Sequence, residues 1–483
     1  MSLFKLHHIR LLMESSIFLR TRIVMIILIC IVPNLLLAQG YYNQENFGNR
    51  SILLTGNVTG SVDDLGLAFY NPARLALIEE PNFTINAKAY QMGNIKINNV
   101  FGRNNKLSNS EFEGLPSLVA GTFKIGESEK HKFAYSVLSR RKSSVDLGFT
   151  REIDETVLDE FDNVERFLAE LKLGDSETDE WLGLSWATKL KDNFSIGVST
   201  FVSIYDYKGG YKLNYSRLDT ESNAAAYDNE INFSQNSYGI FWKIGLAWQL
   251  SKVDLGLNID LPYLELYDSG ELEFKEVLSG IGGGNDIFEY ADWDDLNADR
   301  KEPLAISVGA GLPIGKSKIH LKVDWHGKVS EYDRLTIPVI DDSGNVISFS
   351  FKEELRSVIN FGVGVEIYAS EKVSFYASAG TDFSPMVSNA NIFDLIAKKS
   401  KDTNFDADYY HYGFGIQLKM SWAELVLGST YSTASTDFDR PVDFPDPEIE
   451  IPNNDDPASI TANRWRFIVG LEIPIFGHKV EFK

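Results

Sequence analysis

The chain has 483 residues, of which 44% are hydrophobic and 12% aromatic, and this composition excludes a disordered protein. Its formal net charge of −22 argues against nucleic acid as a partner, because phosphate contacts need clustered lysine and arginine. Size and composition allow either several soluble domains or one large β architecture, so the fold class has to come from the residue pattern.

The N-terminus has the features of a secretory signal peptide. Arg20 and Arg22 precede an apolar run that ends at Ala38 and is too short for a membrane-spanning helix. We therefore predict that residues 1–38 are a signal peptide and that cleavage also removes Cys30, the single cysteine. An exported chain without disulfides must be held together by burial or by a closed hydrogen-bond network.

A short helix is predicted just before the first strand. The stretch begins with the acidic pair Asp63 and Asp64 and continues to "NPARLA", in which Asn71 suits an N-cap. Pro72 suits the first helical position, where its missing N–H costs nothing.

Beyond this point the dominant signal is alternation of apolar and polar residues with period two, which predicts strands. In the segment 194–205 one face is apolar and the other is mostly small or polar. The apolar face is formed by Phe194, Ile196, Val198, Thr200, Val202 and Ile204. Such alternation fits a β-sandwich, whose apolar face meets a core, as well as a transmembrane barrel, whose apolar face meets lipid.

The lengths of the connections favour the barrel. Fourteen strands are predicted, and short turns alternate with long polar connections, as expected for the periplasmic and extracellular ends of an outer-membrane barrel. A sandwich has no reason to sort its loops by length. The predicted strands are 82–98, 115–126, 131–141, 178–190, 193–207, 236–250, 252–263, 303–313, 317–330, 347–368, 372–384, 408–420, 422–433 and 463–476. The predicted fold class is all-β, a transmembrane antiparallel β-barrel of about 14 strands.

Three features of this region together resemble the N-terminal region of FadL-type outer-membrane transporters, which take up long-chain fatty acids and other hydrophobic compounds. They are the acidic pair, the motif "NPARLA" and the motif "PNFTINA" at 81–87. The resemblance covers the architecture of the mature chain, with motif similarity confined to about residues 50–90. It implies that residues 39–80 form a hatch that plugs the lumen of a barrel formed by residues 81–483. The hatch residues it singles out are Asp63, Asp64, Asn71, Pro72, Ala73, Arg74 and Leu75. A barrel of this size is an open channel unless something occupies its lumen, because its own side chains do not fill it.

Two features depart from the family pattern. Arg74 stands where related sequences often have glycine, and the loops are unusually long and acidic. A related branch, the PorV-like proteins, serves type IX secretion as an outer-membrane partner of exported proteins and shares the same motif. Two functions therefore remain open: passive uptake of a hydrophobic small molecule such as a long-chain fatty acid, or binding of secretion-system proteins.

In the second long loop, apolar residues recur at intervals of three and four, which predicts a helix. Its apolar stripe would either capture a hydrophobic ligand at the extracellular mouth or pack on neighbouring loops. The candidate ligand-binding residues are Val157, Phe161, Val164, Leu168 and Leu171.

A polar wall is predicted for one later strand, where His320, Lys322, Asp324 and His326 share the face expected to line the lumen. The acidic segments 292–299 and 437–457 lack EF-hand spacing, so solvated charge is predicted there and no metal site is assigned. The alternative is that divalent ions bridge these loops to lipopolysaccharide phosphates. No Gly-x-Ser-x-Gly motif accompanies the histidines, so the chain is not predicted to be an enzyme, and no cofactor is expected. The predicted location is the outer membrane of a Gram-negative bacterium, in contact with lipid and lipopolysaccharide.

Overall fold

The structure, a computed structural model, describes residues 41–78, 82–99, 106–123, 125, 130–154, 164–280, 284–340, 346–387, 406–438 and 458–474. All of them belong to one compact unit, Ala38–Lys483. The predicted signal peptide lies outside the described residues. Within them, no helix is long and apolar enough to cross a membrane.

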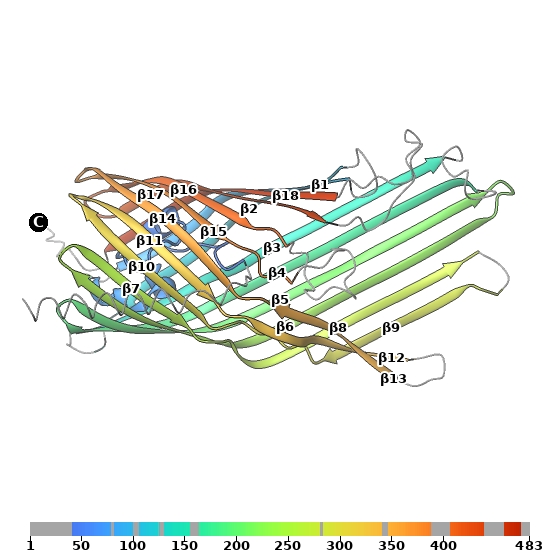
Figure 1. Ribbon diagram of the computed structural model, residues 1–483, viewed down its shortest axis with the longest axis horizontal. Helices are drawn as coiled ribbons and strands as arrows, with labels where there is room; N and C mark the ends of the chain where they lie inside the picture. Colours follow the sequence, from blue (N-terminus) through green and yellow to red (C-terminus); the bar gives the residue numbers. More distant parts are fainter. Residues whose placement is uncertain are drawn as a thin grey trace, which may run out of the picture. The chain divides into compact units, whose positions relative to one another are not determined.

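In the described part of the chain, three short helices precede a long series of strands (Figure 1). The helices are α2 (Asn49–Leu53), α3 (Leu67–Tyr70) and the 3₁₀ helix η1 (Pro72–Leu77). The strands are β1 (Asn82–Asn98), β2 (Lys106–Phe123), β3 (His131–Asp154), β4 (Val164–Lys191), β5 (Phe194–Asp219), β6 (Ala224–Leu250), β7 (Val253–Asp260), β8 (Leu264–Ser279), β9 (Ile287–Leu296), β10 (Ala305–Ile314), β11 (Ser317–His326), β12 (Val329–Ile340), β13 (Val346–Leu355), β14 (Val358–Ser370), β15 (Val373–Asp382), β16 (Tyr409–Lys419), β17 (Glu424–Phe438) and β18 (Ala458–Pro474).

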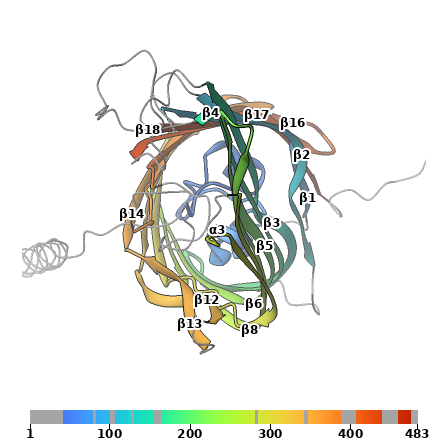
Figure 2. The same cartoon turned by 90° about the vertical axis from the view of Figure 1, so that its right-hand side faces the viewer.

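Fourteen of these strands form a closed antiparallel barrel, as predicted. Around the ring the order is β5, β4, β3, β2, β1, β18, β17, β16, β15, β14, β11, β10, β7 and β6, and pairing of β6 with β5 closes it (Figure 2). Closure leaves the ring without an unpaired edge strand, which is the condition for spanning a bilayer with strands.

Four strands were not predicted as separate elements. β8 and β9 form a hairpin. β8 pairs with the N-terminal part of β6, residues 226–240, and β7 pairs with its C-terminal part, residues 243–250. β12 and β13 form a hairpin of their own, so the single strand predicted over 347–368 is in fact the end of this hairpin followed by β14. Several predicted long loops are therefore extensions of the sheet: β4 alone has 28 residues, whereas a bilayer needs about 9–11.

The apolar face of the barrel strands points outward. On β5 the predicted apolar residues Val202 and Ile204 are 43% and 40% exposed, whereas Ser203 between them is fully buried. The same outward band includes Leu184, Val308, Val323, Phe361, Val363, Phe375, Phe414 and Val469. Large apolar side chains exposed on every wall fit contact with lipid and not with water.

The helix predicted in the second long loop is wrong for those of its residues that the structure describes. Val157 and Phe161 lie outside the described residues, but β3 extends to Asp154 and β4 begins at Val164, so the described parts are strand. On β4 alternate residues point inward, which buries Leu171 while Leu168 stays 36% exposed. A short apolar run is compatible with the periodicity of a helix and with that of a strand. Here the hydrogen-bonded pairing of β4 with β3 and β5 makes it a strand.

The outward band predicts a specific sensitivity to charge. Replacing Phe361→Arg on β14 should destabilise the folded barrel by about 2–4 kcal/mol, because the guanidinium would face hydrocarbon. Urea titration read by heat-modifiable gel migration measures this change. The matched control is Tyr290→Arg on β9, outside the ring of the barrel, for which we expect less than about 0.5 kcal/mol. Equal effects of both variants would contradict the assignment of the band.

Candidate functional site

Residues 41–78 lie inside the ring of strands, where Figure 2 shows α3 enclosed by the barrel. On one side, the Ser199 hydroxyl of β5 donates to the Ala68 carbonyl at 2.7 Å. On the opposite side of the ring, the Ser378 hydroxyl of β15 donates to the Leu53 carbonyl at 2.9 Å. The segment therefore bridges the interior from wall to wall.

The predicted hatch residue Asp64 organises the fold of this segment. Its buried carboxylate accepts hydrogen bonds from the Ser51 backbone N–H at 2.9 Å and the Ser51 hydroxyl at 2.8 Å. It also accepts from the Gly66 N–H at 3.0 Å. One side chain thus joins the first helix of the segment to the turn before α3.

Arg74 has a structural role that explains its place in the motif. Its guanidinium is completely buried and donates to the carbonyls of Gly60 and Val62 and to the Asp63 carboxylate, each at 2.8 Å. Burial alone would raise the pKa of Asp63, but the charges of Arg74 and Arg50 outweigh it and lower that pKa. The arginine therefore provides donors for three acceptors, two of them carbonyls of buried residues, which a glycine could not do.

The predicted helix start is confirmed. The Asn71 side chain accepts from the Ala73 N–H at 3.2 Å, and Pro72 occupies the first position of η1. The Asn71 amide also donates to the Leu246 carbonyl of β6 at 3.1 Å, so the cap also contacts the barrel wall. Leu75, on the same helix, is buried.

Glycines in the wall allow this close approach. A Cβ added at Gly197 of β5 would lie 2.5 Å from the Pro72 carbonyl carbon. One added at Gly245 of β6 would lie 2.2 Å from Asn71 Oδ1. Any larger residue at either position would force η1 away from the wall.

Replacing Arg74→Ala should loosen the segment without unfolding the barrel. Two buried carbonyls would lose charged donors, so we expect local opening of residues 60–64 to become easier by about 3 kcal/mol. Hydrogen exchange of those amides measures the change. Asp63→Ala is the control, because the Asp63 side chain is 44% exposed and its loss should cost less. Unchanged exchange in Arg74→Ala would contradict the role assigned to the arginine.

The segment contacts two chemically different walls. Towards β4, β5 and β6 the contact combines aromatic packing with hydrogen bonds such as that of Ser199: the Phe69 ring lies 5.8 Å from Trp181 and 6.5 Å from Phe201, measured between ring centroids. Towards β15 the contact is polar, since the Asp382 carboxylate accepts from the backbone N–H groups of Tyr42 at 3.0 Å and Asn43 at 2.9 Å.

The four residues predicted to face the lumen are buried on β11 and line this polar wall. His320 Nδ1 lies 2.6 Å from the Ser61 hydroxyl, and the His326 ring stacks on Tyr42 with centroids 3.7 Å apart. Lys322 and Asp324 form an ion pair at 2.7 Å. Lys322 Nζ also donates to the Asn43 side chain at 3.1 Å.

Beside residues 41–47 lies a cavity of about 190 Å³, here named the charged chamber. Seven cationic and five acidic side chains line it, a cationic excess within a chain whose net charge is −22. The cations are Arg140, Arg141, Lys142, Arg300, Lys301, Arg334 and Arg464, and the acids are Glu45, Asp175, Glu177, Glu302 and Glu353.

Most of the chamber's charges are paired with one another. Arg140 donates twice to the Glu302 carboxylate, at 2.5 and 2.6 Å, and Arg300 donates to Asp179 at 2.7 Å. Arg300 also lies over the Tyr205 ring, with its guanidinium carbon 4.0 Å from the centroid. These pairs fix the positions of two guanidiniums on the wall.

Arg334 of β12 differs from these arginines. It is 5% exposed, donates to the Gln235 amide oxygen at 2.8 Å and to the Tyr205 hydroxyl at 3.2 Å, and lies over the Tyr207 ring. The Glu353 carboxylate of β13, which also lines the chamber, acts on this guanidinium electrostatically. A buried guanidinium whose hydrogen bonds go to neutral groups at the edge of a cavity is suited to bind an anion.

The wall beside the chamber is split. β2 and β3 pair only between Leu118–Phe123 and Phe133–Leu138 in the described residues, although both strands continue further. Just past this point β3 has a bulge between Ser139 and Arg141, and its residues 140–145 line the chamber. The chamber therefore lies next to a break in the sheet.

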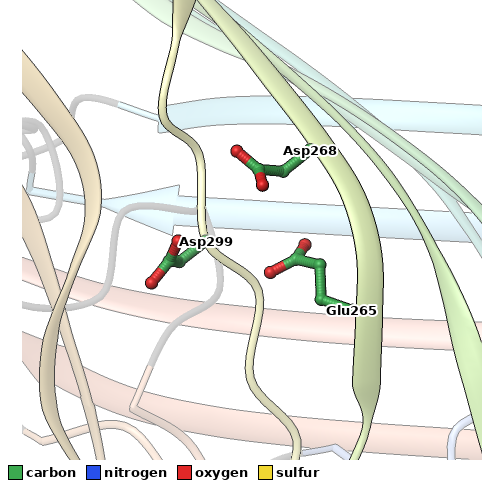
Figure 3. Close-up of side chains that lie close together, drawn as sticks. All are labelled: Glu265, Asp268 and Asp299. Carbon is green, nitrogen blue, oxygen red and sulfur yellow. The ribbon is translucent and has the colours of Figure 1, made fainter.

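Three acidic residues at the base of the β8–β9 hairpin, Glu265, Asp268 and Asp299, lie close together (Figure 3). Their carboxylate oxygens lie within 4.8 Å of one another, and no other cluster among the described residues is close enough to hold a metal ion. Each already accepts a hydrogen bond from the protein. Glu265 accepts from the Ser237 hydroxyl at 2.5 Å, and Asp268 accepts from the Ala298 N–H at 2.9 Å. The expectation that the acidic segment 292–299 carries solvated charge and no metal stays a prediction.

The sequence reasoning missed the charged chamber. The run "SRRKSS" at 139–144 is a basic cluster in an acidic chain and could have drawn attention to it. The remaining cations are spread over three distant segments, which no local pattern connects.

The closed ring of fourteen antiparallel strands, with an apolar outer band and a chain segment inside, defines the architecture of an outer-membrane channel barrel. The comparisons with solved structures agree. A Pseudomonas aeruginosa FadL homologue is 14% identical, and the match covers 90% of this chain and 100% of that one with a TM-score of 0.53. The P. putida toluene transporter TodX is 10% identical, with coverages of 90% and 100% and a TM-score of 0.56.

The CymD monoaromatic hydrocarbon channel is 12% identical, with coverages of 91% and 100% and a TM-score of 0.55. The chain thus shares its fold with FadL-type channels, as the N-terminal motif led us to expect, and these neighbours are transport channels. No protein-family model matches the sequence, and no curated protein sequence matches it either.

Proposed function

We propose that this protein is an outer-membrane channel for passive uptake of amphipathic small molecules that carry an apolar body and an anionic head group, such as long-chain fatty acids. The charged chamber is the observation that carries the choice of cargo. A hydrocarbon gains nothing from guanidinium groups, whereas a carboxylate accepts paired hydrogen bonds from arginine. The cationic excess of the chamber supports an acid and not a neutral hydrocarbon.

The apolar body of the cargo also has a complementary surface. Ile95, Val145 and Tyr409 line the chamber and belong to an apolar cluster with Leu171 and Leu173 of β4. This cluster joins β3 and β4 to β1, β17 and β18 across the barrel end. With the head group held by Arg334, the tail would lie against these residues. Each Å² of apolar surface that is thereby removed from water would contribute roughly 25 cal/mol to the binding free energy.

In this proposal residues 39–80 act as the hatch and Asp63, Asp64, Asn71, Pro72, Ala73, Arg74 and Leu75 hold it together. The support is its position inside the ring and its contacts with opposite walls. Cargo would pass from the chamber either through the break between β2 and β3 or along the polar wall beside the hatch. No energy source is required, since release follows the concentration gradient.

Uptake of a radiolabelled fatty acid tests the proposal. Cells of a Gram-negative host without its own fatty-acid channel should accumulate oleate when they make this protein, and should gain less for toluene. Equal rates with and without the protein would reject the transport function. Co-purification of exported proteins from detergent-solubilised membranes, without an uptake defect on gene loss, is the result expected if the protein serves type IX secretion instead.

A further inference from the structure

β9 is the outermost strand of the sheet. It pairs with β8 over Ile287–Leu296 on one side and has no strand partner on its other side among the described residues (Figure 1). Its outer edge therefore presents backbone N–H and C=O groups in the spacing of a strand. Such an edge pairs with another extended chain unless something prevents it.

The first half of β9 carries two exposed aromatic side chains. Phe288 is 81% exposed and Tyr290 is 56% exposed, and their alternate positions put both on one face. The C-terminal half of β9 is anchored differently, because Trp293 and Leu296 pack with Leu335 in a cluster beneath the hairpin. The first half of the strand thus projects with both its edge and its aromatic face open.

The β8–β9 hairpin is strongly acidic. Residues 264–296 contain ten acidic side chains and one basic one, Lys275. Lys275 Nζ is already paired with Asp228 of β6 at 2.5 Å. β9 itself contains four acids and no base. The surface around the open edge therefore attracts positive charge.

Acidic residues on an edge strand also protect it against pairing, as lysine does in many proteins. Protection, however, does not require Phe288 and Tyr290, which add apolar surface where a protective edge would have none. A second copy of the same edge would bring acid against acid, and lipopolysaccharide phosphates would be repelled in the same way. The charge therefore selects a basic partner.

We propose that β9 is a docking edge for a basic, extended segment of a partner protein, which adds to the sheet as a further strand. Main-chain hydrogen bonds to the outer edge provide the binding, and lysine or arginine of the partner pairs with Glu289 on one face of β9 and with Asp292 on the other. Apolar residues of the partner cover Phe288 and Tyr290. The site is independent of the charged chamber and of the transport function.

The test uses the full-length protein in detergent and a fluorescent ten-residue peptide in which pairs of lysines alternate with pairs of valines, so that both faces of the added strand carry lysine. Fluorescence anisotropy should show saturable binding, whereas the twin peptide with glutamate in place of lysine should not bind. The double variant Glu289→Lys and Asp292→Lys should weaken binding at least about tenfold. The control Asp192→Lys and Glu221→Lys changes the charge equally at two exposed turns and should leave binding within about twofold.

Hydrogen exchange separates strand addition from loose attraction. Bound peptide should slow exchange of the β9 amides, and Phe288→Ala with Tyr290→Ala should weaken binding while leaving heat-modifiable migration unchanged. Equal weakening by both charge-reversing doubles would overturn the proposal, because it would show attraction to the acidic surface in general. Binding without added protection in β9 would also overturn it, since the peptide would then lie elsewhere.

Discussion

Deletion of residues 39–80 is expected to leave a folded barrel that leaks small hydrophilic solutes. The ring closes through strand pairs that do not involve this segment, so the backbone hydrogen bonds of the wall remain. The segment nevertheless fills the interior from β5 to β15, and a lumen of fourteen strands is too wide for its own side chains to fill. Liposome swelling with sugars should rise from the background of protein-free vesicles to the level of an open porin.

The experiment needs a control for folding, which heat-modifiable gel migration provides for the deletion and the intact chain alike. Arg74→Ala serves as an intermediate, because it loosens the segment without removing it and should leak less than the deletion. A folded deletion variant whose permeability equals that of the intact protein would show that residues 39–80 do not act as a hatch.

Replacing Arg334→Gln is expected to weaken binding of a fatty acid by about tenfold to a hundredfold, because a hydrogen bond to a charged group inside a cavity is lost. The methyl ester of the same acid has no charge for the guanidinium to bind, so its affinity should change little. Equilibrium binding of both ligands to the protein in detergent measures the difference.

The matched control is Arg217→Gln, which removes the same charge from an exposed position on β5 outside the chamber. Arg334→Lys is a further comparison, since it keeps the charge but not the planar pair of donors and should recover part of the affinity. An equal loss for acid and ester would mean that Arg334 maintains the fold of the chamber instead of binding the head group.

Much of the barrel could be predicted because its strands meet lipid on one face. Each of the fourteen predicted strands overlaps a strand of the ring, and the alternation in β5 and β11 separates exposed from buried side chains in the structure. The helix at Pro72 was equally predictable, since its cap depends on neighbours in the sequence. Local periodicity and local capping are properties that a sequence carries directly.

The extensions beyond the membrane band were not predictable in the same way. β8, β9, β12 and β13, and the outer halves of β3 and β4, are polar or mixed strands whose pairing partners decide their structure. The apparent helical spacing near Leu171 illustrates the problem, because its apolar residues also suit a strand and the pairing with β5 decides between them.

The charged chamber depends still more on the tertiary structure. Arg140 and Glu302 are 162 positions apart in the sequence, and Arg334 and Gln235 are 99 apart, yet each pair is hydrogen-bonded. Closure of the barrel is what brings these side chains together. The sequence by itself determined the strands, their inward and outward faces and the capped helix, because these follow from periods of a few residues. Only the closed barrel decided which charges meet in its interior and that β9 is left with an open edge, because both depend on contacts between distant strands.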